Sequence, residues 1–259
     1  MHPRAGEAAF AVAQHPCSAA LAPFAEYVWS VDWDLTPGVS HLQRILPQPA
    51  VHLSFEPDRS RVTGPLRRTS AGYELTGRGR AVGVRFRPGG ARPWLPGPVA
   101  TLVDVELPVS AMVPMPDDAT ADLCARVQTA PTPTAAAALV DAALASWVPA
   151  PDPAIARAEE LVGLVDAEPA ISRVEHLAAR LALSPRTLQR FCAEWIGVPP
   201  RELVRWARLH EAAGRAAAGP VDWAALAAEL GYADQAHLTR DFTRVVGEPP
   251  ARYARAETG

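Results

Sequence analysis

The sequence predicts an α+β protein with a β-rich N-terminal part and an all-α C-terminal part. Three observations support this division. Short alternating apolar and polar stretches, separated by Gly and Pro, recur between Phe24 and Arg87. Strong helix formers dominate from residue 117 onward, and residues after 154 read as helix almost throughout. The helical part also contains one pattern twice, as expected for two copies of the same unit.

Composition limits the classes of protein that fit. The chain has 259 residues, 49% of them hydrophobic, which suffices for two packed domains. Its net charge is −3 and it contains no lysine, so a nucleic-acid site must be a local patch of arginine. We expect a protein without cofactor or metal.

The three cysteines, Cys17, Cys124 and Cys192, lie far apart. Their spacing suits neither a zinc site nor a disulfide framework. No secretory signal and no apolar run long enough to cross a membrane is evident. These features predict a cytoplasmic protein with no membrane association.

The β-rich part is expected to contain several short strands. Residues 1–20 show no clear pattern and are expected to form a loose lead-in. Phe24–Trp33 alternates well, and His41–Glu56 reads as two short strands interrupted at Pro47–Pro49, since proline cannot donate to a central ladder. The other expected strands are Val62–Gly64, Gly72–Leu75 and Ala81–Arg87. Such a series suggests a compact barrel or sandwich.

Three side chains of this part are candidates for ligand binding. Arg85 and Arg87 share one face of their strand and suit a carboxylate, although a solvated strand face is the alternative. Trp29, like Trp33 and Trp94, suits either a pocket wall or an aromatic core. His41 and His52 lack neighbouring ligands for a metal.

Residues 117–148 are expected to be helical. The helix over residues 134–148 is rich in alanine and suits either a dimer interface or packing against its own domain. Pro149–Pro153 reads as a stiff linker. The expected organisation is 1–116 β-rich regulatory domain, 117–148 helical segment, 149–153 linker and 154–259 DNA-binding domain.

The repeat is the strongest pattern in the chain. Leu177 and Leu181 correspond to Leu226 and Leu230, and the motif Leu188–Arg190 corresponds to Leu238–Arg240. Each copy reads as a helix, a turn, a second helix, a glycine stop and a Pro-Pro helix start. This is the outline of a helix-turn-helix. The expected helices span about 154–167, 174–182, 185–196, 200–217, 222–230, 235–246 and 249–254.

The second helix of each copy has an apolar and a polar face. Leu188, Cys192 and Trp195 are expected to point inward, as are Leu238 and Phe242 in the second copy. Polar residues near the helix N-termini are left to face outward. In the major groove, Arg suits guanine and Gln suits adenine, because each forms paired hydrogen bonds. The candidate DNA contacts are Arg186, Thr187, Gln189, Arg190, Arg201, Gln235, Ala236, His237 and Arg240.

The helix that joins the copies sets their separation. Its 18 expected residues span roughly 27 Å at 1.5 Å per residue, close to the roughly 34–36 Å between successive major-groove faces. Its arginines suit either phosphate contacts or simple solvation. They are Arg201, Arg205, Arg208 and Arg215.

Residues 154–255 resemble the DNA-binding domain of AraC/XylS transcription regulators. The resemblance is carried by the two Leu-x-Arg motifs, by GYADQAHLTRDF at 231–242 and by GEPPARY at 247–253. It implies contact with two adjacent major-groove segments by one chain. Cys192, where the first copy usually has Phe, and Ala236, which has no hydrogen-bonding side chain, depart from the pattern.

The N-terminal part resembles a domain found in a bacterial subset of that family. RILP at 44–47, VTGP at 62–65 and GVRFRPGGA at 83–91 carry this shorter match. It implies a sensor domain with a cupin-like barrel.

Together these features predict a transcription regulator and not an enzyme, since no catalytic motif is present. Its expected partners are double-stranded DNA, an unknown small-molecule effector and RNA polymerase, and it acts as a monomer or homodimer. Two alternatives stay open. One is a constitutive DNA binder whose N-terminal domain only dimerises. The other is an N-terminal enzyme domain fused to a DNA-binding module.

Overall fold

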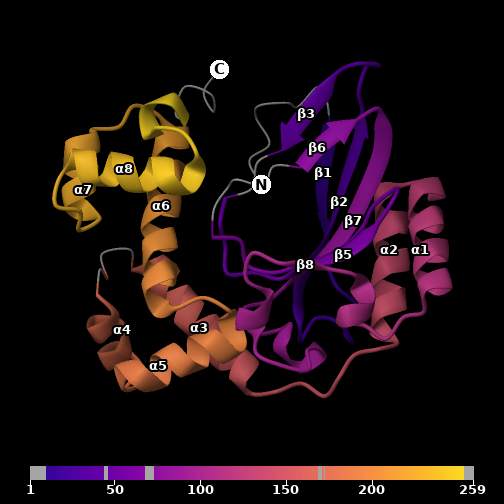
Figure 1. Cartoon of the computed structure of the whole chain (residues 1–259), viewed down its shortest axis with the longest axis horizontal. Helices are drawn as coiled ribbons and strands as arrows, with labels where there is room; N and C mark the ends of the chain where they lie inside the picture. The colour runs from indigo at the N-terminus through magenta and orange to yellow at the C-terminus, as the bar shows by residue number, and fades with distance from the viewer. Residues whose placement is uncertain (1–9, 44–45, 68–72, 169–170, 172, 254–259) are drawn as a thin grey trace.

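The computed structural model describes residues 10–43, 46–67, 73–168, 171 and 173–253 (Figure 1). An antiparallel sheet forms the centre of the N-terminal part, with strand order β1-β2-β7-β4-β5-β8. Its strands are β1 (Phe10–His15), β2 (Ala25–Asp34), β4 (His52–Phe55), β5 (Ser60–Thr63), β7 (Arg78–Phe86) and β8 (Glu106–Leu107). A separate pair consists of β3 (Ser40–Gln43) and β6 (Tyr73–Thr76).

Two sequence-based expectations need correction here. In the described part of the chain β1 and β8 are the edges of an open sheet, so the expected cupin-like barrel does not close. The lead-in is also ordered over residues 10–15, because β1 pairs with β2 from Phe10 opposite Trp33 to His15 opposite Val28. A short edge strand containing two alanines carries little alternation of its own, and pairing with the long β2 defines it.

Helices α1 (Asp117–Thr129) and α2 (Pro133–Ala145) cover one face of this sheet (Figure 1). The Arg80 guanidinium donates to Asp32 at 2.6 Å and to the carbonyls of Val127 and Ala130 at the end of α1. The buried Asp141 of α2 accepts the Ser18 backbone N–H at 2.8 Å. The alanine-rich helix therefore packs on the sheet of its own chain.

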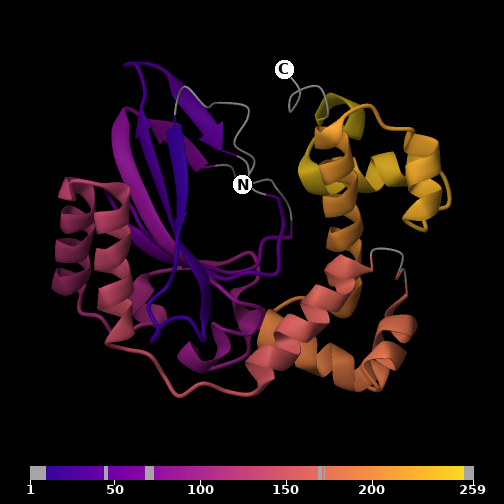
Figure 2. The same ribbon diagram turned by 180° about the vertical axis from the view of Figure 1, so that it is seen from behind.

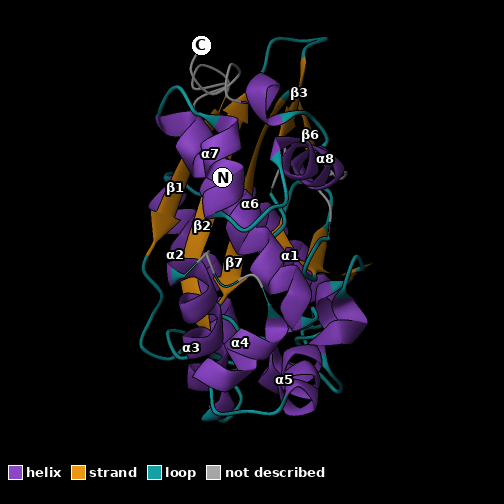
Figure 3. Cartoon of the chain, turned by 90° about the vertical axis from the view of Figure 1, so that its left-hand side faces the viewer, coloured by secondary structure: helices purple, strands orange, loops and turns teal. Residues whose placement is uncertain are grey.

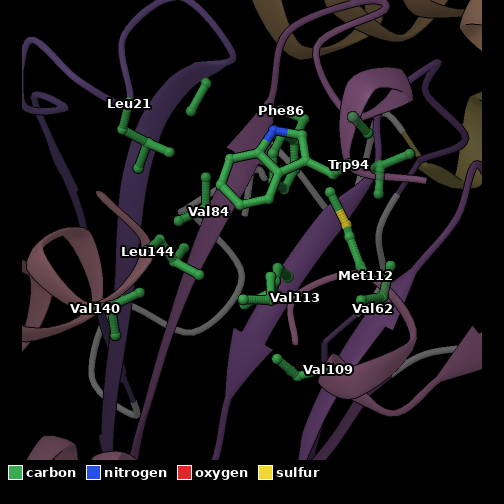
Figure 4. Packing of buried hydrophobic residues seen from close by; sticks show 14 of the residues in the cluster. Leu21, Val62, Val84, Phe86, Trp94, Val109, Met112, Val113, Val140 and Leu144 are labelled. Carbon is green, nitrogen blue, oxygen red and sulfur yellow. The ribbon is translucent and has the colours of Figure 1, made fainter. Parts of the chain in front are cut away.

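The hydrophobic core lies between this sheet face and its covering segments (Figure 4). Val82, Val84 and Phe86 of β7 point into it, as the strand alternation predicts. Trp94 also lies in this core, edge-on to Phe24 and Phe86 with ring centroids 5.7 and 5.9 Å away. Of the two interpretations of Trp94, the aromatic core is confirmed. Three short 3-10 helices, η1 (Arg92–Trp94), η2 (Val99–Leu102) and η3 (Val109–Ala111), line this region.

The C-terminal part is helical and has two lobes, one at each end of α6 (Figure 2). Its elements are α3 (Ala154–Ala167), α4 (Val174–Arg180), α5 (Pro185–Phe191), η4 (Cys192–Ile196), α6 (Pro200–Ala218), α7 (Trp223–Glu229) and α8 (Gln235–Val246). Each lobe has its own hydrophobic cluster, and α6 contributes to both. None of the helices in the described ranges is long and apolar enough to cross a membrane.

Candidate nucleic-acid interface and pocket

Each lobe contains a helix-turn-helix whose second helix starts with a side-chain cap. Ser184 caps α5 by accepting the Thr187 backbone N–H at 3.1 Å. Asp234 caps α8 by accepting the His237 backbone N–H at 2.6 Å. Such caps satisfy amide groups that the helix leaves without partners and fix where each helix begins.

The outward faces of α5 and α8 carry most of the predicted DNA contacts. Leu188 and Leu238 are buried, so the opposite face of each helix is turned to solvent. The exposed predicted residues are Arg186, Gln189, Arg190, Gln235, Ala236, His237 and Arg240. Within the described residues, the guanidinium groups of Arg186, Arg190 and Arg240 make no hydrogen bond or ion pair. They are therefore available to an external partner.

Two predicted contacts have internal partners. The Thr187 hydroxyl is half-buried and lies 2.8 Å from the Ser184 hydroxyl, where it takes part in the cap. The His237 ring stands edge-on to Tyr232, with centroids 5.2 Å apart. Both side chains therefore have a structural role within their own helix-turn-helix unit.

Three of the four predicted arginines of α6 have a partner within the protein. Arg205 donates from Nε to Asp241 at 3.0 Å, Arg208 lies 3.7 Å above the Tyr232 ring centroid, and Arg215 donates to Glu211 at 2.7 Å. Arg201 is exposed and has no such partner within the described ranges. Of these four arginines, Arg201 is the one suited to a phosphate.

Arg244 is a further candidate that the sequence interpretation missed. It is exposed one turn after Arg240 on α8, and the described residues give it no ion pair. Residues four apart share one face of a helix, so this spacing could have identified it.

The second helices of the two helix-turn-helix units lie on the same side of α6. Figure 3 shows α5 and α8 nearly end-on, on the same side of the helical part. The 19 residues of α6 between them correspond to about 28 Å of helix.

The end of α5 modifies one prediction. Trp195 was expected to point into the helix-turn-helix core; it is half-buried and packs at the edge of that core, while the next residue, Ile196, is fully buried in it. The cause is a π-helical turn at Cys192–Ile196, which places more residues in one turn than an α-helix does. Trp195 consequently packs against both the N-terminal core and the first lobe.

A pocket of about 570 Å³ lies on the sheet face opposite α1 and α2. Trp29 and Arg85, both predicted ligand residues, belong to its wall, as does Trp33. Arg87, the third predicted ligand residue, is not part of this wall. It follows the last residue of β7, where its guanidinium donates to the Ala22 and Ala25 carbonyls and to Glu159 of α3 at 2.7 Å.

Family models match both parts of the chain. Residues 177–256 match a family described as a helix-turn-helix domain, which confirms the AraC-type resemblance of the C-terminal part. Residues 13–108 match a family described as a domain of unknown function (DUF6597). No curated protein sequence matches the chain.

The chain also resembles solved structures of ToxT from Vibrio cholerae. One has 12% identity and a TM-score of 0.44, over 97% of this chain and 100% of the ToxT chain. A structure of ToxT with bound unsaturated fatty acid has 11% identity and a TM-score of 0.40, over 95% of each chain. These TM-scores describe a loose likeness of overall shape.

Proposed function

The chain carries an AraC-type helix-turn-helix domain at its C-terminal end, and on that premise we propose that it is a sequence-specific DNA-binding transcription regulator controlled by a small molecule. The observation that carries this proposal is the pair of helices α5 and α8. The two helices lie on one side of α6, near its opposite ends, and each carries exposed Arg and Gln side chains. Arg and Gln are the side chains that pair with guanine and adenine in the major groove.

The proposed base-reading residues are Arg186, Gln189, Arg190, Gln235, Ala236, His237 and Arg240. Thr187 lies beside them at the cap, and Arg201 is assigned to a backbone phosphate. Ala236 has only a methyl group, which suits contact with a thymine methyl. Because the two sets of side chains differ, the two DNA half-sites should have unequal sequences.

The pocket supports control by a small molecule because two segments of the N-terminal part that line it also contact the helical lobes. Leu46 lines the pocket and packs against the hydrophobic cluster of the second lobe. Gly64 and Leu66 also line it, and Pro65 between them lies against Gly197 of the first lobe. A ligand that favours one position of these segments changes DNA affinity by its differential affinity for the two arrangements.

The test is site selection followed by footprinting. The full chain should select a split sequence from random DNA and protect such a site upstream of its own or a neighbouring gene. Candidate metabolites should alter that protection. Failure to enrich any sequence would contradict the proposed function. Enrichment without any metabolite response would instead support the constitutive DNA binder.

Leu46→Ala tests the link between pocket and DNA. This variant should bind DNA and ligand but lose much of the ligand effect on the footprint. Val39→Ala, at a side chain that is 51% exposed, is the control and should respond normally. An unchanged ligand response in Leu46→Ala would show that the signal takes another route.

A further inference from the structure

Two tryptophans, Trp29 and Trp33, form the floor of the pocket, and the indole ring of each packs against a glycine of the neighbouring strand. On adjacent strands Trp29 of β2 faces Gly83 of β7, and Trp33 faces Gly79. A Cβ at Gly79 would come within 2.5 Å of the Trp33 ring, and one at Gly83 would overlap the Trp29 ring. Each indole therefore rests with one side against the backbone, and both contribute to the cavity wall.

The strand register places apolar side chains and polar side chains of the pocket wall at different positions along the strands. At one end, Trp33 lies in a small hydrophobic cluster with Val31 and Ala81, next to Val12 and Leu75. At the other end, Arg85 pairs with Tyr27 across one strand boundary and with His52 across the other. Trp29 lies between these ends, so a molecule bound there contacts apolar and polar groups at once.

Two arginines of the wall, Arg85 at the polar end and Arg61 level with Trp29, already pair with carboxylates of the protein. Arg85 donates to Glu26 at 2.6 Å and also to Gln48. Arg61 donates to Glu56 at 2.6 Å and to Glu106 at 2.9 Å. A carboxylate ligand would have to compete with these protein carboxylates for the guanidinium groups.

His52 adds no charge to this end of the pocket. Burial and the nearby Arg85 lower its pKa to about 3, so the imidazole is neutral at physiological pH. Its Nε2 atom lies 3.1 Å from the Gln48 side-chain nitrogen.

One donor in the wall lacks an acceptor. Trp33 Nε1 donates to the Thr76 carbonyl at 3.0 Å, whereas Trp29 Nε1 is buried without a hydrogen-bond partner in the described part of the chain. That N–H has no exposed surface, so a molecule in the cavity meets the Trp29 ring and not its donor.

We propose that this pocket binds an uncharged, planar aromatic molecule that stacks on the tryptophan floor. The role of such a molecule as effector rests on the proposed function, whereas its binding to the pocket does not. Flat aromatic rings stack in offset or edge-to-face arrangements on indole.

Three probes of similar size separate the required properties. 2-Naphthamide is planar, uncharged and carries an acceptor. 2-Naphthoate has the same shape with a negative charge, and decalin-2-carboxamide keeps the amide but is saturated and not planar. Calorimetric titration of the full chain without DNA should show 2-naphthamide binding about threefold to tenfold more tightly than the saturated amide. The preference over the carboxylate should be at least about tenfold.

Trp29→Leu tests the stacking because it keeps an apolar side chain and removes the aromatic ring. It should weaken 2-naphthamide binding about fivefold. Trp147→Leu is the matched control, since Trp147 is 40% exposed and lies outside the pocket. Its affinity should equal that of the parent chain.

The proposal is overturned if 2-naphthoate binds best, if the saturated amide binds equally well, or if no probe binds at millimolar concentration. Equal loss in both tryptophan variants would also overturn it. Site selection on DNA is scored separately. Failure there with intact 2-naphthamide binding would therefore refute the regulator and leave the ligand class standing.

Discussion

The two helix-turn-helix units have similar outer faces but differ in how they contact the N-terminal part. In the first unit, formed by α4, α5 and η4, Glu194 accepts from Arg92 at 2.6 Å and Trp195 packs into the N-terminal core. In the second unit, formed by α7 and α8, Leu46 is the hydrophobic residue of the described N-terminal part that packs against the core. One unit is anchored over a broad contact, and the other is held mainly through α6.

This difference follows the sequence of each recognition helix. The first has Cys192 and a π-helical turn, which directs Trp195 towards the N-terminal part. The second is a regular helix with Phe242 fully buried at the corresponding position, and Tyr253 packs edge-on against that ring. The anchored unit takes part of its stability from its neighbour, whereas the second unit relies on its own core.

The largest expected loss of stability comes from truncating a buried side chain at equivalent positions of the two units. Phe242→Ala should destabilise the second unit by about 3–5 kcal/mol, because it removes a fully buried ring. Cys192→Ala removes one sulfur atom and should cost no more than about 1.5 kcal/mol. Urea unfolding and hydrogen exchange measure the two costs, and similar losses would mean that the two units do not differ as described.

The outer faces are tested by removing matched arginines. Arg190→Ala and Arg240→Ala should each weaken specific DNA binding by about 1–3 kcal/mol and relax preference at one base position. Titration against the selected site and its single-base variants measures both effects. If both variants kept the parent affinity and sequence preference, these two residues would not be the base readers.

The contact between the N-terminal part and the first lobe is tested by removing two ion pairs that cross it. Arg92→Gln and Glu159→Gln break the pairs Arg92–Glu194 and Arg87–Glu159, which are partly exposed and should contribute about 0.2–1 kcal/mol each. Hydrogen exchange should increase in the first unit and not in the second. Arg126→Gln breaks an exposed pair on α1 and serves as the control. Faster hydrogen exchange in the second unit alone would mean that the second unit, and not the first, is anchored by these ion pairs.

The smallest effect is expected at Arg201. Arg201→Ala should weaken binding to all sequences alike and reduce the slope of log affinity against log salt by about 0.9. Arg215→Ala, which loses an intramolecular pair with Glu211, should leave that slope unchanged. Binding isotherms at several salt concentrations make the comparison, and an equal change in both slopes would remove the distinction between these arginines.

The sequence predicted the elements whose signals are local. The predicted helix limits 154–167 and 235–246 agree with α3 and α8, because proline, caps and glycine mark their ends. The alternation in β2 correctly separated the face of Trp29 from that of Val28. Exposure of Arg190 and Arg240 also followed from helical period alone.

Features that depend on distant partners were not predictable in this way. The π-helical turn accompanies contact with the N-terminal part, and β1 is defined by its pairing with β2. Arg87 shares the alternation of Arg85, but it lies beyond the end of β7 and pairs with Glu159 of α3. The structural role of Arg208 required knowledge that Tyr232 lies beneath it.

The length of α6 sets both the distance between the two lobes and their rotation relative to each other about the helix axis. Each residue of an α-helix adds about 1.5 Å and turns the following segment by about 100°. One extra residue in α6 would therefore move α8 only slightly along the duplex but would rotate its reading face away from the groove that α5 faces. Seven extra residues, close to two full turns, would restore the direction and lengthen the spacing by about 10 Å. If the chain reads two half-sites as proposed, their spacing on DNA should depend on the number of residues in α6.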